Sequence, residues 1–140
     1  MIRYELEKKL LENSLSANDI PQYWNEQYDY LLGIKVPDDR NGCLQDVHWS
    51  HGSFGYFPTY SLGSFYAAQF YATVTLEMPL LEKTFSQHTA PLLQWLRNQV
   101  HIKGRMYTSD ELCTKITGEG LNVAPFLSYL TDKYKLIYNL

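Results

Sequence analysis

The sequence predicts an all-α fold of six or seven helices. Apolar residues recur at three- and four-residue steps in successive stretches, and this spacing places them on one face of a helix. Proline, glycine and helix-capping residues separate these stretches. No stretch alternates apolar and polar residues over the length of a typical strand. We therefore expect residues 1–140 to form a single helical domain.

The first two helices are expected before Gly33. Residues 2–13 carry an apolar stripe with no capping residue ahead of it, which suggests the tail of a longer helix. That stripe consists of Ile2, Leu6 and Leu10. A second helix is expected from the Asn18-Asp19 cap to Gly33, since proline is common in the first turn and glycine after the last. Its expected core face consists of Trp24, Tyr28, Leu31 and Leu32.

A long helix rich in aromatic residues is expected from Pro58 to the break at Met78-Pro79. The helix is aromatic enough that we expect most of it to be buried. The residues that recur at three- and four-residue steps are Leu62, Phe65, Tyr66, Gln69, Phe70 and Thr73. A short helical piece should follow at about residues 80–85.

Three helices with local start signals complete the chain. Thr89 is a plausible cap for the first, and Thr108 with Glu111 fits the capping box for the second, which Gly118 should end. Asn122 is expected to cap the last helix. The expected core face of this last helix consists of Phe126, Leu127, Leu130, Tyr134 and Ile137.

Composition and charge exclude several classes of partner. The formal net charge is −3, and Lys and Arg are scattered singly, so no basic stripe suits nucleic acid or a membrane surface. No run of apolar residues reaches membrane-spanning length, and the N-terminal segment is unlike a signal peptide. These features predict a cytoplasmic location. Cys43 and Cys113 are isolated, so both are predicted to be reduced, and the alternative is a single disulfide between them.

The segment 42–57 follows no helical period and mixes polar and aromatic residues, so we expect function there. Together with nearby tyrosines it could form a wall that binds a peptide carboxylate or carbonyl. The residues concerned are Gln45, Asp46, His48, Trp49, Tyr56, Tyr60 and Tyr66. The alternative is structural, because aromatic residues at helical spacing usually pack in a core and an Asp beside a His can be a satisfied buried pair.

Other kinds of site find little support. Asp46, His48 and His51 could be metal ligands, but the chain lacks HExxH, the motif that places two histidines on one helical face. His88 and His101 lie in surface-like contexts. No GxSxG motif or glycine-rich phosphate loop occurs, so neither a serine nucleophile nor a nucleotide is indicated.

One segment resembles GxxQDxHW, the signature of the carboxypeptidase Taq family of metallocarboxypeptidases. The matching residues are Gly42, Gln45, Asp46, His48 and Trp49. The resemblance to that family's sequences extends from the first helix to about Tyr138. Besides the signature, it includes residues 34–39, 50–60 and 66–69. The resemblance implies a helical, zinc-dependent and generally dimeric exopeptidase that removes single residues from peptide C termini.

In such enzymes the zinc is held by the two histidines of HExxH and a later glutamate, all of which precede the matching segment. The resemblance therefore implies the C-terminal, substrate-side portion of a larger helical fold. We expect this chain to bind no zinc, to be inactive alone and to form a homo-oligomer. One alternative is a stand-alone, non-catalytic module that binds peptides or dimerises, and another is a purely structural helical domain.

The resemblance also implies roles for individual residues. Gln45, Asp46, His48, Trp49 and Tyr60 are expected to line the substrate groove. His48 and Tyr60 are the candidate auxiliary donors to the scissile carbonyl or terminal carboxylate, with Asp46 fixing the tautomer of His48 and Trp49 packing the loop. No metal ligand is assigned. Arg3 is not assigned to substrate binding either, because Leu6 and Glu7 depart from the family's IRxxAD motif.

Overall fold

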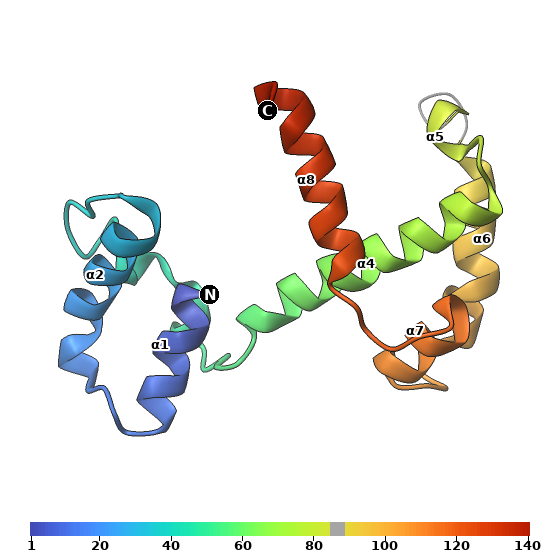
Figure 1. Cartoon of the computed structure of the whole chain (residues 1–140). Coiled ribbons are helices and arrows are strands. Elements are labelled where there is room, and N and C mark those ends of the chain that lie inside the picture. Colours follow the sequence, from blue (N-terminus) through green and yellow to red (C-terminus); the bar gives the residue numbers. More distant parts are fainter. Residues whose placement is uncertain (85–88) are drawn as a thin grey trace. The chain divides into compact units, whose positions relative to one another are not determined.

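A computed structural model describes residues 1–84 and 89–140 of the chain, and all regular structure in these two ranges is helical (Figure 1). The predicted all-α class is therefore confirmed. The chain divides into two compact units, residues 1–61 and 62–140. None of the helices in the described ranges combines the length and apolarity that crossing a membrane requires.

The first unit contains three helices, two short 3-10 turns and the start of a fourth helix. These elements are α1 (Ile2–Leu11), η1 (Ala17–Asp19), α2 (Ile20–Leu32), η2 (Cys43–Gln45), α3 (Val47–Ser50) and the first turn of α4 (Phe57–Glu77). Both predicted helices before residue 33 are present, and α2 ends at Gly33 with a φ of 65°. The sequence did not predict α3, because four residues are too few to show a helical period.

A small apolar core joins α1 and α2 to the signature segment. Leu6, Trp24 and Cys43 are buried together, and Leu10 and Tyr28 pack against them. The predicted faces are only partly confirmed, since Leu31 and Leu32 are 38% and 57% exposed. These two leucines lie in the last turn of α2, beyond Tyr28, the last α2 residue that reaches the cluster.

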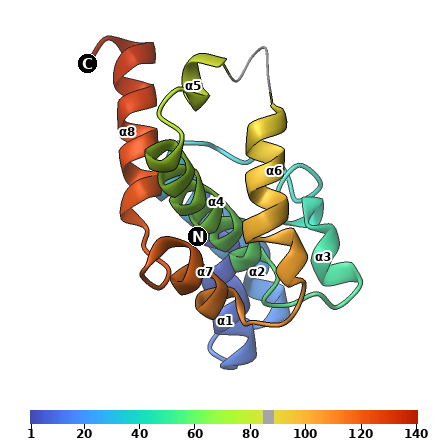
Figure 2. The ribbon, with the colours of Figure 1, turned by 90° about the vertical axis from the view of Figure 1, so that its right-hand side faces the viewer.

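The described residues of the second unit, 62–84 and 89–140, form the rest of α4 and four further helices. These are α5 (Leu81–Thr84), α6 (Ala90–Gln99), the 3-10 turn η3 (His101–Lys103), α7 (Ser109–Thr117) and α8 (Ala124–Tyr138). Figure 2 shows α6 and α8 on either side of α4. The core lies between α4, α5 and α6, where Val74, Leu81 and Trp95 are buried. Part of the piece expected at residues 80–85 lies outside the described residues.

The predicted cap of α7 is confirmed, whereas the N-cap position of α8 is Val123, one residue after the Asn122 that was expected there. The Thr108 hydroxyl accepts a bond of 3.3 Å from the Glu111 amide, and the Glu111 carboxylate accepts one of 2.8 Å from the Thr108 amide. The Asn122 side-chain oxygen accepts a bond of 2.9 Å from the Ala124 amide. Thr89 precedes α6 as expected, but its side chain makes no capping bond.

Two expectations about burial are wrong. Only Gln69 and Val74 of α4 are buried, so most of this aromatic helix is accessible. No residue of α8 is buried, and Leu127 and Ile137 of its expected core face are 54% and 55% exposed. Both helices carry more apolar surface than the elements packed against them can cover.

Candidate functional site

Gly42 opens the signature segment and is required there by close packing. It is buried, and a Cβ added to it would lie 2.6 Å from Val36 Cγ1 and 3.0 Å from the Asp38 carbonyl oxygen. The second distance involves backbone, so the neighbours could not move aside easily. The signature glycine therefore lets the chain pass close to the loop before it, which positions the residues that follow.

Asp46 is the buried centre of the signature segment, at 7% exposure. Its Oδ1 accepts a bond of 2.8 Å from the His48 amide, which caps α3. The same oxygen lies 3.3 Å from His48 Nδ1, and Oδ2 lies 3.3 Å from Arg3 Nε. A buried carboxylate needs such partners because leaving water is costly for a charge.

His48 and Tyr60 meet at the exposed side of this segment. Tyr60 begins the second turn of α4, and its hydroxyl lies 3.3 Å from His48 Nε2. The His48 ring is enclosed by aromatic neighbours, with ring centroids 4.6 Å away for Phe57 and 5.6 Å for Tyr56. Tyr60 itself is 56% exposed, so this pair of polar groups can be reached by a ligand.

Trp49 and Gly55 are both tied to Glu7, a residue that the sequence did not single out. The Trp49 indole donates to one Glu7 carboxylate oxygen and the Gly55 amide donates to the other, each at 2.9 Å. Glu7 is 2% exposed. A glutamate next to Leu6 on an amphipathic helix is usually solvated, and the only available signal was its place four residues after Arg3.

The remaining candidate residues have other surroundings. Gln45 is exposed, and its side-chain amide donates to the Arg40 carbonyl oxygen. His51 turns its Nδ1 to the Ser53 hydroxyl at 2.9 Å. Tyr66 belongs to the second unit, where burial is the main cause of its raised pKa.

The described residues do not fit a metal site. No three side chains of His, Cys, Asp or Glu in residues 1–84 and 89–140 are arranged to hold a metal ion. The rings of His48 and His51 are 5.8 Å apart, and Asp46 is paired with Arg3, so the trio considered from the sequence is not assembled as ligands. His88 lies outside the described residues, and His101 is exposed.

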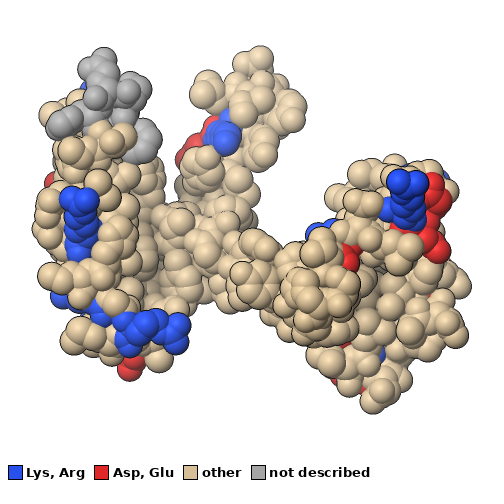
Figure 3. Space-filling view, turned by 180° about the vertical axis from the view of Figure 1, so that it is seen from behind, with Lys and Arg blue, Asp and Glu red and all other residues tan. Residues whose placement is uncertain are grey.

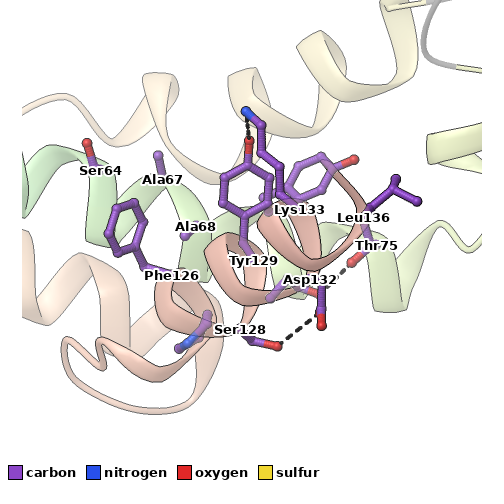
Figure 4. A pocket seen from close by; sticks show the side chains of 13 residues that line it. Ser64, Ala67, Ala68, Thr75, Phe126, Ser128, Tyr129, Asp132, Lys133 and Leu136 are labelled. Carbon is purple, nitrogen blue, oxygen red and sulfur yellow. Dashed lines mark hydrogen bonds between the residues drawn. The ribbon is translucent and has the colours of Figure 1, made fainter. Parts of the chain in front are cut away.

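A separate groove runs between α4 and α8 in the second unit. It encloses about 1130 Å³, and no signature residue lines it. Figure 4 shows small residues of α4 facing larger ones of α8. Two polar contacts lie along α8, from Ser128 to Asp132 at 3.4 Å and from Lys133 to Tyr129 at 3.1 Å, and the second is the main cause of the raised pKa of Lys133. The groove is lined by Ser64, Ala67, Ala68, Tyr71, Ala72, Thr75, Pro125, Phe126, Ser128, Tyr129, Asp132, Lys133 and Leu136.

Surface charge does not mark a further site on the visible face. Figure 3 shows Lys and Arg in small separate groups among uncharged residues, with Asp and Glu close to several of them. This pattern agrees with a net charge of −3 made of 12 basic and 15 acidic residues. Long-range attraction of a polyanion requires a continuous basic surface, which this face lacks.

Known proteins match this fold and this segment together. A profile of the carboxypeptidase Taq (M32) metallopeptidase family matches residues 1–134. Thermostable carboxypeptidase 1 of Thermus thermophilus is 42% identical over 99% of this chain and 27% of its own length. Carboxypeptidase 1 of Bacillus subtilis is 41% identical over 99% of this chain and 28% of its own. The structure of an M32 carboxypeptidase from Deinococcus radiodurans R1 matches with a TM-score of 0.94 and 38% identity, over 99% of this chain and 28% of that one.

The chain therefore belongs to the carboxypeptidase Taq family of metallopeptidases, as its GxxQDxHW signature indicated. It spans little more than a quarter of the length of these relatives, between 27% and 28%. The described residues of this chain contain only helices as regular structure, and the signature lies in the first of the two units.

Proposed function

We propose that this chain is the substrate-side part of a metallocarboxypeptidase that removes single residues from peptide C termini. The observation that carries the proposal is the contact of 3.3 Å between His48 Nε2 and the Tyr60 hydroxyl, with buried Asp46 behind the histidine. Two polar groups thus lie side by side at an accessible surface, and one of them, His48, belongs to the family signature.

The chemistry available here is hydrogen bonding to a peptide oxygen. Oxygens of a scissile carbonyl or a terminal carboxylate gain negative charge or carry it, and preorganised donors stabilise them. Asp46 lies 3.3 Å from His48 Nδ1, which favours a proton on that nitrogen. Neutral His48 then accepts at Nε2 from the Tyr60 hydroxyl, whereas protonated His48 donates from both nitrogens. Donation from His48 to substrate therefore requires the imidazolium form.

Zinc belongs to the whole enzyme in this proposal. The family is one of metallopeptidases, and the described residues offer no cluster that would hold a metal. We propose that the zinc ligands and the group that activates water lie in the part of the enzyme that this chain does not span. The chain alone should then turn over no peptide. The cytoplasmic location stays a prediction.

The first test measures the chain by itself. Purified chain is dialysed against zinc, its metal content is determined, and release of the C-terminal residue from a blocked dipeptide is followed. We expect no stoichiometric zinc and no turnover. Stoichiometric zinc together with turnover would contradict the proposal, because it would require a metal site in these 140 residues.

The second test uses a full-length family enzyme that carries this segment. Replacing His48 by Ala or Tyr60 by Phe should lower kcat roughly a hundredfold to a thousandfold, which is the usual effect of losing one donor to a developing oxyanion. His51→Ala is the matched control, because His51 turns to Ser53. Unchanged turnover of the His48→Ala enzyme would rule out the role assigned to His48.

The exposed apolar face of α8 favours a second candidate function, which is self-association. Leu136 is 81% exposed and Ile137 is 55% exposed, and apolar surface gathered on one element often marks an interface. We propose a homo-oligomer that buries this face. Light scattering should show more than the 16.3 kDa of one chain, and Leu136→Lys should shift the mass to that value. A monodisperse monomer before substitution would contradict it.

A further inference from the structure

We propose that Arg3 and Glu7 of α1 are positioning residues that set the tautomer and orientation of His48. Arg3 acts through Asp46, and Glu7 acts through Trp49 and Gly55. The catalytic meaning of this inference rests on the function proposed above, but the arrangement itself can be tested without activity.

The two residues lie on one face of α1. They are four positions apart in a helix that runs from Ile2 to Leu11, and this spacing puts side chains one above the other. Glu7 is 2% exposed and the side chain of Arg3 is 34% exposed. Both are in contact with the signature segment, so a single helix face provides one positive and one negative group to that segment.

Arg3 holds the buried carboxylate of Asp46. Its guanidinium carbon lies 4.7 Å from the Phe57 ring centroid and 5.3 Å from that of Trp24, so aromatic faces fix the side chain. Nε is 3.3 Å from Asp46 Oδ2, although in the described residues neither atom has a hydrogen-bond partner. The pair therefore acts through charge. It leaves Asp46 Oδ1 for the amide and ring of His48.

Glu7 holds the chain on both sides of the His48 pocket. Trp49 follows His48 directly, and Gly55 precedes Tyr56, whose ring stacks on His48. Gly55 has a φ of 76°, a conformation that favours glycine, and it turns its amide to Glu7 at 2.9 Å. Both Glu7 oxygens are used as acceptors. Glutamine would place an N–H group against one of the two donors, so Glu7→Gln should disturb one contact while keeping the shape.

A second pair of Trp and Glu in this chain shows how a structural contact differs from the contact made by Glu7. Trp95 of the second unit also donates to a glutamate, at 2.7 Å to Glu77. Glu77 is exposed at the end of α4. Glu7 instead is buried, which costs free energy that an apolar residue of similar size would not. A buried carboxylate that receives two donors beside a candidate site is better explained by a need for exact geometry.

The experiment measures the tautomer of His48 directly. Chain labelled with ¹⁵N-histidine is studied by NMR, and His48→Gln assigns the signals. We expect His48 to be mainly the Nδ1–H form when neutral, because the Asp46 carboxylate faces Nδ1. Arg3→Gln removes the group that holds Asp46 Oδ2, so the carboxylate can turn away from His48 Nδ1. The ratio of the Nδ1–H to the Nε2–H form should then fall roughly fivefold. Arg3→Lys should restore part of this, since it keeps the charge but not the planar stacking.

Glu7→Gln tests the second arm, with Glu77→Gln as its matched control. Glu7→Gln should speed solvent exchange of the Trp49 indole N–H roughly tenfold and should also lower the His48 tautomer ratio. Glu77→Gln should change only the Trp95 indole signal. Amide spectra check that each variant is folded. If Arg3→Gln does not fold, the single variants Arg3→Lys and Glu7→Gln test the inference.

The inference is overturned if the Arg3 variants and Glu7→Gln leave the His48 tautomer ratio unchanged while the chain stays folded. In that case α1 only supports the loop. Failure of the proposed function would look different. A full-length enzyme would then be insensitive to His48→Ala, while the tautomer of His48 in this chain would still respond to Arg3 and Glu7.

Discussion

Each unit of this chain buries a polar side chain that joins distant segments, but the two units use different chemistry. The first unit buries carboxylates, with Glu7 at 2% and Asp46 at 7% exposure. The second buries a neutral amide, Gln69, also at 2%. The Gln69 side chain donates to the Thr117 hydroxyl at 3.1 Å and to the Gly120 carbonyl at 3.0 Å. Its oxygen accepts from the Asn122 amide at 2.8 Å.

The difference shows what each unit requires. A neutral amide with its bonds satisfied is enough to hold α4 to the connection between α7 and α8, because desolvating an amide costs much less than desolvating a charge. The carboxylates of the first unit cost more, and they lie around His48 and Tyr60. Charge is therefore buried where polar groups are oriented, and a neutral group is buried where helices are joined.

One cysteine in each unit allows the two to be studied separately. Cys43 and Cys113 are free and buried, at 5% and 0% exposure. Burial is the first cause that raises the pKa of both thiols, so the reactive thiolate is scarce in the folded chain at neutral pH. The rate at which a thiol reagent labels each cysteine should follow the opening of the unit that contains it. Because these pKa values are raised by folding, both units should lose stability as pH rises through the thiol range.

The largest effect is expected for Gln69→Leu, which leaves the Asn122 amide and the Gly120 carbonyl without their partner. We expect a loss of about 3 kcal/mol in the free energy of unfolding of the second unit. Labelling of Cys113 should become roughly a hundredfold faster, while labelling of Cys43 stays unchanged. The matched control is Gln45→Leu, an exposed glutamine of the first unit, which should be nearly neutral. Equal losses of stability for the two substitutions would contradict the structural role of Gln69.

A smaller effect is expected for Gly42→Ala in the first unit. The new methyl group would meet Val36 at 2.6 Å and the Asp38 carbonyl at 3.0 Å, so we expect a loss of about 1–3 kcal/mol. Hydrogen exchange of α1 amides measures it, with α7 as the internal reference. Gly63→Ala is the matched control. Apart from its chain neighbours and the backbone of its own helix, no atom lies within 4 Å of a Cβ added at Gly63 in α4. Alanine is also the better helix former, so this change should be neutral or stabilising. A larger loss of stability for Gly63→Ala than for Gly42→Ala would refute the packing role of Gly42.

The smallest effect is expected for Thr108→Ala, which removes the capping box of α7. We expect a loss of about 1 kcal/mol in the second unit, measured by Cys113 labelling. Hydrogen bonds from Thr108 are the main cause that lowers the pKa of Glu111. Their stabilising contribution is therefore present above the ordinary pKa of 4.5 and is lost as pH falls through the lower folded value. NMR titration of Glu111 in the variant should give a higher pKa, and an unchanged value would disprove this linkage.

The fold was predictable wherever its signals are local. The capping box of Thr108 and Glu111 and the glycine after α2 mark helix ends through contacts over a few residues. Burial was not predictable in the same way. The apolar residues of α8 suggested a core face, yet Leu127 and Ile137 are exposed, because burial depends on which other elements cover a helix.

The candidate site was predictable as a set of residue types and not as an arrangement. The signature named Asp46 and His48, and their contact follows from being two positions apart. The contact between His48 and Tyr60 spans 12 positions and was not predicted, although both residues were named as candidate donors to the substrate. Arg3 was considered only through the IRxxAD motif and was not assigned. Glu7 was not singled out, since charged residues on an amphipathic helix usually face water.

The sequence by itself determined the longer helices, most of their ends and the family, because cap bonds and signature residues are short-range features. Only the tertiary structure decided which polar groups are buried and what they hold. The bonds from Glu7 to Trp49 and from Gln69 to Asn122 join residues 42 and 53 positions apart. Whether such a group is buried depends on the surfaces that fold against it, because a charge or an amide leaves water only where partners replace the lost hydration.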